Sequence, residues 1–364
     1  MSCTVATVLG LHWGSQAGPV LICVSKRLIG ACAPRSSVAH ACDELEYALL
    51  WRAAPETMPL TQRLRLRNVE WHPEALRGTC VRAARVWPLP CMLRELRMDR
   101  VDEWVRPLCW EAAPTALEAV SLNRCTLTPH MAAALLRGAA LRTVEMDRVA
   151  GVPERFPRGL AVADGRGTTR AWERLVARSC GLRGGLDAWL LTGLKSLDLS
   201  SNELSGNMDL TSLPAGLTEL TLSDNQFTGN VDLASLPEGL IQLALGNNKL
   251  SGRLDLTSLP AGLQQLFLGV NELTGSLDLS SLPAQLTQLS LDVNQFTGNV
   301  NLKSLPPGLT WLSLSYNELS GWVDLTSLPS GLQWLALSPK QATGPLDRES
   351  LPAGLLIRRA NEYL

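Results

Sequence analysis

The sequence predicts a repeat solenoid, in which a parallel β-sheet lines one face and short segments return along the other. Two observations predict this fold. From Leu194 onward the chain repeats every 23 residues without insertion, and each repeat begins with leucines at the two-residue spacing of a half-buried strand. Because several residue types keep this register over seven periods, the repeats must be structural units that stack on one another.

One unit reads L-x-x-L-x-L-x-x-N-x-[LF]-[ST]-G-x-[LV]-D-L-x-S-L-P-x-G. The first position of each unit is occupied by Leu194, Leu217, Leu240, Leu263, Leu286, Leu309, Leu332 and Leu355. The ninth position is occupied by Asn202, Asn225, Asn248, Asn271, Asn294 and Asn317.

This unit resembles the leucine-rich repeat, and the resemblance covers about half of the chain. The [LF]-[ST]-G step is similar to the plant-type subclass and the S-L-P-x-G-L step to repeats of protists, whereas the Asp-Leu step differs from the plant-type Ile-Pro. The resemblance implies an α/β leucine-rich-repeat solenoid, or horseshoe. Its parallel β-sheet would form the concave face, and short extended or helical segments would form the convex face.

Within one repeat, the alternation predicts that Leu220 and Leu222 point inward, while the residues between and beside them point outward. Twenty-three residues leave no room for a long helix on the return path. We therefore expect a tight turn at Gly229 and a second short extended run over residues 231–233.

Two polar columns follow from the repeat. The resemblance implies that the inward-facing asparagines form a structural ladder, in which each buried amide bonds the turn backbones of its own and neighbouring repeats. The second column is Asp209, Asp232, Asp255, Asp278, Asp324 and Asp347, interrupted by Asn301. Local hydrogen bonds to neighbouring Ser, Thr or backbone amides are expected there, with a ladder of bound cations as the alternative.

The front half contains weaker patterns of the same kind. Segments with the same leucine spacing begin at Leu93, Leu117 and Leu141, a fourth begins at Trp172, and residues 63–66 predict one more strand. A short helix is expected over residues 129–137 and an irregular unit over 154–169. The predicted organisation is one continuous solenoid with an N-terminal segment or cap (1–45), irregular repeats (46–193), regular repeats (194–354) and a C-terminal cap (355–364).

Charge is distributed unevenly between the two halves. Residues 194–364 contain 8 Lys and Arg against 16 Asp and Glu, a charge of −8, and residues 1–193 contain 25 against 18, a charge of +7. Opposite signs suggest two differently built regions. A charge of +7 over 193 residues is too dilute to predict nucleic-acid binding.

Cysteine usage favours a reducing compartment. All nine cysteines lie in the first 180 residues, no C-x-x-C pair occurs, and the chain has no N-x-S/T sequon. We expect an intracellular protein, cytoplasmic or cytoskeletal, with mitochondrial or other organelle targeting as the alternative because no acidic residue precedes Asp43. No membrane span is expected, since the apolar runs at the start are much shorter than the roughly 20 residues that a spanning helix needs.

Signals of catalysis are missing from the sequence. The four histidines, His12, His40, His72 and His130, do not have metal-ligand spacing, and no phosphate-binding glycine loop or nucleophile motif occurs. We therefore expect no catalytic residue, metal, cofactor or small-molecule substrate.

Recognition signals lie at the outward positions of the predicted strands. Most are small and uncharged, but Phe267, Trp311 and Trp334 are large aromatics, and Tyr316 follows one of these strands. We expect them to bind a protein partner, or alternatively the two tryptophans to pack on each other or on the C-terminal tail. The expected polar surround is Gln265, Gln288, Ser290 and Ser313.

The sequence thus predicts a non-catalytic protein-protein interaction scaffold, such as one subunit of a large intracellular assembly. Two other functions stay open. One is a surface or secreted recognition receptor, and the other is a regulator or adaptor of an enzyme such as a GTPase or a ubiquitin ligase. The sequence does not name the partner.

Overall fold

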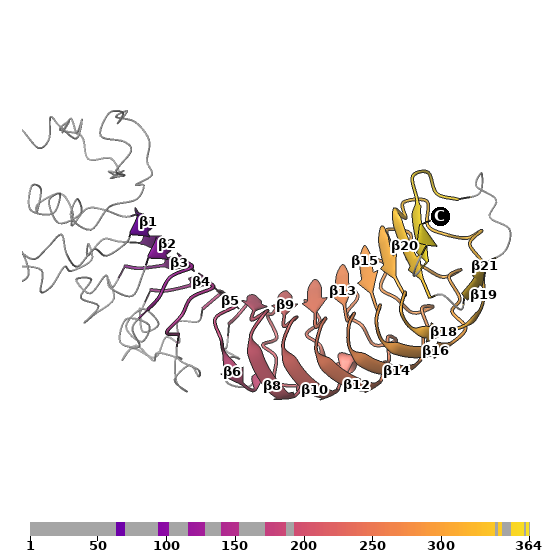
Figure 1. Ribbon diagram of the computed structural model, residues 1–364, viewed down its shortest axis with the longest axis horizontal. Coiled ribbons are helices and arrows are strands. Elements are labelled where there is room, and N and C mark those ends of the chain that lie inside the picture. The colour runs from indigo at the N-terminus through magenta and orange to yellow at the C-terminus, as the bar shows by residue number, and fades with distance from the viewer. Residues whose placement is uncertain are drawn as a thin grey trace, which may run out of the picture. The chain divides into compact units, whose positions relative to one another are not determined.

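The computed structural model describes residues 63–69, 94–101, 116–127, 140–152, 172–186, 193–338, 341–343, 351–359 and 362–363 (Figure 1). The chain divides into two compact units, Met1–Gly181 and Leu182–Leu364. The expected N-terminal cap, the helix over 129–137 and the irregular unit over 154–169 lie outside the described residues.

The described part of the first unit is a parallel sheet. Its strands, in spatial order, are β1 (Arg63–Val69), β2 (Glu95–Val101), β3 (Ala119–Asn123), β4 (Thr143–Asp147) and β5 (Arg174–Arg178). The register pairs Leu96 with Val120, Val120 with Val144, and Val144 with Leu175, and all four side chains are buried. The strands therefore lie where the spacing of apolar residues predicts them.

The second unit has two parallel sheets. We call the first the concave sheet, because within this unit its strands lie on the concave side in Figure 1. It consists of β7 (Ser196–Asp198), β9 (Glu219–Thr221), β11 (Gln242–Ala244), β13 (Gln265–Phe267), β15 (Gln288–Ser290), β17 (Trp311–Ser313), β20 (Trp334–Leu337) and β22 (Leu356–Arg359), with β23 (Glu362–Tyr363) antiparallel to β22 at its end. Glu219 pairs with Gln242 and Gln242 with Gln265, so each pairing advances by one repeat.

The second sheet of this unit, the outer sheet, lies on the opposite side (Figure 1). It consists of β6 (Arg183–Gly184), β8 (Glu203–Asn207), β10 (Gln226–Asn230), β12 (Lys249–Arg253), β14 (Glu272–Ser276), β16 (Gln295–Gly298) and β18 (Glu318–Leu319), and a separate pair joins β19 (Gly321–Val323) to β21 (Gln341–Thr343). A 3-10 turn, η3 (Leu233–Ser235), lies on the path from the outer sheet back to the concave sheet.

The outer sheet corrects the expected return path. The second extended run is β10 at residues 226–230, not residues 231–233, and Gly229 lies inside this strand rather than at a separate turn. Gly229 has φ +91°, and a Cβ atom at this position would lie 1.6 Å from Asn207 Oδ1 of the preceding repeat. Glycine is favoured there because the backbone is left-handed, and because a Cβ atom would displace the side-chain amide of Asn207.

Leucines from both sheets fill the space between them. Leu220 and Leu222 of the concave side and Phe227 of the outer side are each fully buried, and leucine or phenylalanine recurs at these positions in the repeats from Leu194 to Pro329. The apolar residues that one repeat buries include Leu217, Leu220, Leu222, Phe227, Val231 and Leu233. A full layer exists only where the next repeat covers it, so stacking of the repeats creates the core.

The last repeat departs from the 23-residue period. Trp334 pairs with Leu356 and Leu335 with Ile357, an offset of 22 residues. Ile357 is therefore buried and Leu356 is 60% exposed, although the sequence period would place Ile357 beside Trp334. A shift of one residue moves each side chain of a strand to the other face of the sheet.

Candidate interaction surface

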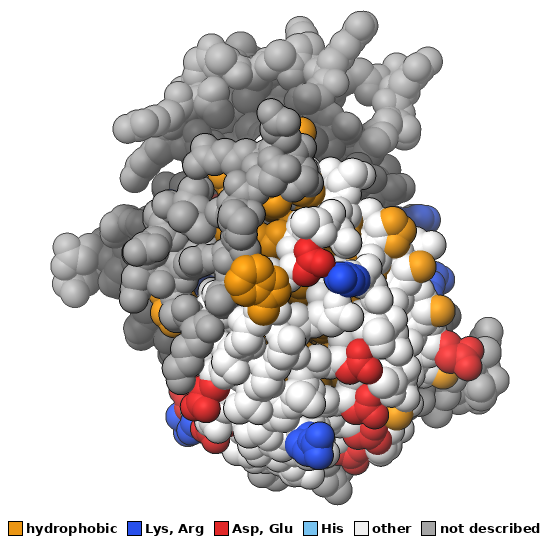
Figure 2. All heavy atoms as spheres, turned by 90° about the vertical axis from the view of Figure 1, so that its right-hand side faces the viewer, with side chains coloured by type: hydrophobic (Ala, Val, Ile, Leu, Met, Phe, Trp, Pro, Cys, Tyr) orange, Lys and Arg blue, Asp and Glu red, His pale blue; other side chains and the backbone are white. Residues whose placement is uncertain are grey.

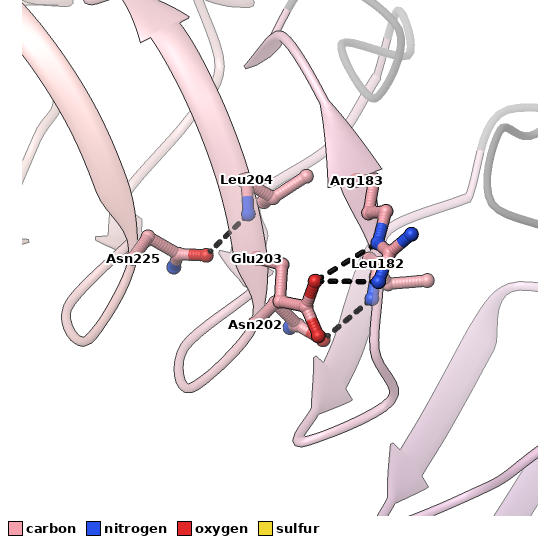
Figure 3. Close-up of polar contacts among 6 residues, drawn as sticks. All are labelled: Leu182, Arg183, Asn202, Glu203, Leu204 and Asn225. Carbon is pink, nitrogen blue, oxygen red and sulfur yellow. Dashed lines mark hydrogen bonds and ion pairs between the residues drawn. The ribbon is translucent and has the colours of Figure 1, made fainter.

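The asparagine at the ninth position of each regular repeat connects neighbouring turns of the second unit. Asn248 Nδ2 donates to Leu222 O at 3.1 Å in the preceding repeat and to Leu245 O at 3.0 Å in its own, and Oδ1 accepts from Phe227 N at 3.0 Å. Figure 3 shows the same arrangement at the start of the column, where Asn225 Oδ1 accepts from Leu204 N at 3.1 Å. These side chains lie between the sheets and offer nothing to a ligand.

Other residues take over where the asparagines stop. Lys340 occupies the ninth position of the last regular repeat and lies outside the described residues. In that repeat the Ser338 hydroxyl bonds the backbone of the preceding repeat: it accepts from Asn317 N at 3.2 Å and donates to Leu314 O at 2.9 Å. In the first unit, the ninth position is taken by Cys125 and Cys180, which are free and buried. Burial raises the pKa of the Cys180 thiol to about 11, which keeps the thiol protonated and unreactive at neutral pH.

The aspartate column makes local bonds. Asp255 Oδ1 accepts from Thr257 N at 2.9 Å and from Thr257 Oγ1 at 2.7 Å, and Asp209 and Asp278 make the same pair of bonds to the residue two positions on. These bonds lower the pKa of each of these carboxyls below its ordinary value. The carboxylates stay ionised and stabilise the turn that leads out of the outer sheet.

The concave sheet places most of the predicted binding residues in two neighbouring columns. Each column takes one residue from each successive strand. The first column is Gln265, Gln288, Trp311 and Trp334, and the second is Phe267, Ser290, Ser313 and Ala336. Not all of the predicted polar surround is available to a partner. Ser290 donates to the carboxylate of Asp292, and Ser313 is only 7% exposed.

Trp311 and Trp334 stack on each other. Their ring centroids are 4.7 Å apart and their planes differ by 6°. The packing that was the alternative to partner binding is therefore present, yet Trp311 is still 39% exposed. Beyond Trp334 the shifted register adds the exposed Leu356 to the same column. We call Trp311, Trp334 and Leu356 the apolar end of the concave sheet.

Tyr316 lies outside these columns. It belongs to the eighth repeat position, directly before each ladder asparagine, where the backbone is left-handed in every regular repeat in which this position is described. This edge column is Ser201, Asp224, Asn247, Val270, Val293 and Tyr316. Val270 and Val293 are exposed although β-branched residues are disfavoured at positive φ. The change from polar to apolar residues along this position is visible in the aligned repeats, and the sequence interpretation missed it.

Within the described residues, no group of three or more His, Cys, Asp or Glu side chains could hold a metal ion. The described helical segments are also too short or too polar to cross a membrane. The four histidines lie outside the described residues. The surface features that the described structure does offer are apolar side chains and regular columns of charge.

Comparison with models of protein families gives no match, and comparison with curated protein sequences gives none either. Three similar solved structures are the following. A TDR receptor is 18% identical over 75% of this chain and 61% of that chain, with a TM-score of 0.48. The ectodomain of the receptor kinase SOBIR1 from Arabidopsis thaliana is 32% identical over 36% of this chain and 73% of that chain, with a TM-score of 0.31. An internalin from Listeria monocytogenes is 18% identical over 69% of this chain and 84% of that chain, with a TM-score of 0.45.

The chain spans less than two thirds of the TDR receptor structure, 61% of its length. Its parallel sheets, its 23-residue turns and the asparagine ladder between those turns give the chain the fold of a leucine-rich-repeat solenoid.

Proposed function

We propose that the chain is a non-catalytic scaffold that binds another protein through the apolar end of its concave sheet. The observation that carries this proposal is the stacked pair of Trp311 and Trp334, of which Trp311 stays 39% exposed. Large exposed aromatics on an otherwise small and uncharged surface are typical anchors of protein interfaces.

The stack also makes this surface rigid. Two indoles in face-to-face contact hold each other's rotamers, so a partner that covers them has little side-chain entropy left to remove. Leu356 extends the apolar column by one strand, and the glutamines Gln265 and Gln288 lie on its other side. An apolar centre with polar side chains around it is the usual arrangement of a protein interface.

The intracellular location belongs to the same proposal. It is supported by the buried free thiols of Cys125 and Cys180 and by the absence of cysteines and sequons in the regular repeats. The surface or secreted receptor is the second candidate, and the adaptor of an enzyme is the third. Protease treatment of intact cells separates the first two, because only a receptor exposed at the surface would be digested.

The binding proposal is tested with three variants of the tagged full-length chain. Trp311→Ala with Trp334→Ala removes the stack, and Trp322→Ala removes a tryptophan that is 59% exposed on β19, away from the concave sheet. The third variant, Asp232→Ala with Asp255→Ala, changes the aspartate column. Circular dichroism first establishes that each variant is folded.

Proteins captured from the native source by the wild type are then compared across the variants, and the affinity of the identified partner is measured by calorimetry. Removing the stack should weaken binding by about thirtyfold or more, since a buried aromatic anchor contributes about 2 kcal/mol. The two control variants should bind like the wild type. Loss of binding in either control, with binding retained in the tryptophan pair, would place the partner on the other side of the second unit.

A further inference from the structure

The first unit has a regular column of positive charge at the edge of its sheet. Arg100 is the next-to-last residue of β2, and Arg124 and Arg148 directly follow β3 and β4; their φ values are 55°, 50° and 52°. The register pairs Asp99 with Asn123 and Asn123 with Asp147, so these arginines stand one strand apart, about 4.8 Å. We call them the arginine column.

The arginine column has no partner within the described part of the chain. All three side chains are exposed, and none of them makes an ion pair or a side-chain hydrogen bond there. Other exposed arginines of the chain are paired: Arg94 with Glu118 at 3.6 Å, Arg142 with Glu173 at 3.1 Å and Arg183 with Glu203 at 2.8 Å. Three unpaired like charges at this spacing repel one another, and an anionic surface with the same repeat would relieve the repulsion.

The second unit has such a surface. The aspartate column places one exposed charge on each turn from Asp209 to Asp278, before Asn301 interrupts it. Asp232 uses both carboxylate oxygens within its own turn, whereas Asp209, Asp255 and Asp278 do not. Each uses Oδ1 for the bonds within its own turn. Their Oδ2 atoms accept no hydrogen bond in the described part of the chain. Figure 2 shows acidic side chains following one another in a row over part of the described surface.

The same column already contains an example of the contact. Asp324 keeps the bonds of its own turn through Oδ1, and its Oδ2 lies 3.1 Å from the ammonium group of Lys303 in the preceding repeat. A cationic side chain therefore reaches the outward oxygen of this column without disturbing the turn.

From these observations we propose that the chain binds a second copy of itself, with the arginine column of one copy on the aspartate column of the next. Opposite sign and one charge per turn on both surfaces favour this occupant over an acidic segment of irregular spacing. The two surfaces differ, so the contact is heterologous: it leaves one arginine column and one aspartate column free and adds further copies, unless a ring closes. This contact is separate from the apolar end of the concave sheet and does not depend on the proposed function.

The test uses the purified full-length chain in sedimentation velocity over a range of concentrations. One variant is Arg100→Gln with Arg124→Gln and Arg148→Gln. The other is Asp209→Asn with Asp255→Asn and Asp278→Asn, which keeps the turns, because Asn301 in the same column accepts from Lys303 N at 3.0 Å. The matched control neutralises three paired arginines, Arg94→Gln with Arg142→Gln and Arg183→Gln.

At about 50 mM NaCl the wild type and the control should associate as the concentration rises, and about 500 mM NaCl should reverse the association. The arginine-column variant and the aspartate-column variant should each associate about 10- to 100-fold more weakly than the wild type, as expected for the loss of three exposed ion pairs. A mixture of the two variants should form dimers and nothing larger, because each supplies the column that the other lacks.

Three outcomes would overturn the proposal. The first is a wild type that stays monomeric at low salt. The second is an arginine-column or aspartate-column variant that associates as strongly as the wild type. The third is a mixture of the two variants that stays monomeric, although each variant is folded by circular dichroism.

Discussion

The replacement Asn248→Ala tests whether the asparagine ladder stabilises the stack of repeats. Asn248 lies in the middle of the regular array, is 9% exposed and bonds four backbone groups of two repeats at distances of 3.0 to 3.3 Å. Alanine removes all of these bonds at once and leaves the Cβ atom in place.

The magnitude depends on which groups lose their partner. Leu222 O also accepts from Asn225 Nδ2 at 3.0 Å, and Leu245 O also accepts from Asn271 Nδ2 at 3.1 Å, so both carbonyls keep a donor. The N–H of Phe227 loses its acceptor inside the core. One stranded buried donor costs about 1–3 kcal/mol, and we expect a loss of this size in the free energy of unfolding.

Two measurements report this loss. The melting temperature should fall by about 2–4 °C per kcal/mol, the range for units of this size. Hydrogen exchange of the Phe227 amide should accelerate more than that of amides in distant repeats, because the defect is local. The control is Asn230→Ala, an exposed asparagine one repeat away, which should change stability by less than about 0.5 kcal/mol.

An unchanged melting temperature together with unchanged protection of the Phe227 amide would refute the argument. It would mean that water or a shifted backbone satisfies this donor at no cost, so that the leucine layers alone hold neighbouring repeats together.

Three further predictions concern the turns and the thiols. Hydrogen bonds from Thr326 lower the pKa of Asp324 to about 2 in the folded protein, compared with 3.8 for an ordinary aspartate. The ionised carboxylate therefore stabilises the fold fully above pH 3.8, and this stabilisation is lost as the pH falls toward 2. The difference in melting temperature between the wild type and Asp324→Asn should shrink over that range, and a difference independent of pH would contradict it. Gly229→Ala should lower the free energy of unfolding in urea by more than about 1 kcal/mol. The control Gly239→Ala should not, because no atom lies within 4 Å of the added carbon. Equal urea midpoints for the two variants would show that the contact at Gly229 relaxes. Cys180, whose pKa is about 11, should resist thiol labelling at neutral pH in the native protein and react after unfolding, as followed by mass spectrometry; rapid native labelling would disprove its burial.

Much of the fold follows from the sequence alone. The 23-residue period and the alternation around Leu220 and Leu222 predict a parallel sheet with one buried face, and the weaker pattern at Leu117 and Leu141 predicts the strands of the first unit. These predictions hold because the same apolar pattern recurs in each turn, so the burial of one repeat implies the burial of all.

The surface was less predictable, because it depends on register and on backbone geometry rather than on residue type. The sequence identified Trp311 and Trp334 as exposed aromatics but did not decide whether they stack, since this depends on direct pairing of β17 with β20. The period also placed Ile357 beside Trp334, and the shifted last strand puts Leu356 there instead.

The repeat by itself determined what lies inside this protein, because an apolar residue at a fixed position of a stacked turn has only the core to occupy. Only the tertiary structure decided what the surface presents. The left-handed backbone at the eighth repeat position turns Arg100, Arg124 and Arg148 into one exposed column, and local turn bonds leave one oxygen of Asp209 and Asp255 facing outward. Summed over residues 1–193, the positive charge is too dilute to predict nucleic-acid binding. The folded chain arranges some of these charges in a column, since neighbours in a column come from residues about 23 or 24 positions apart.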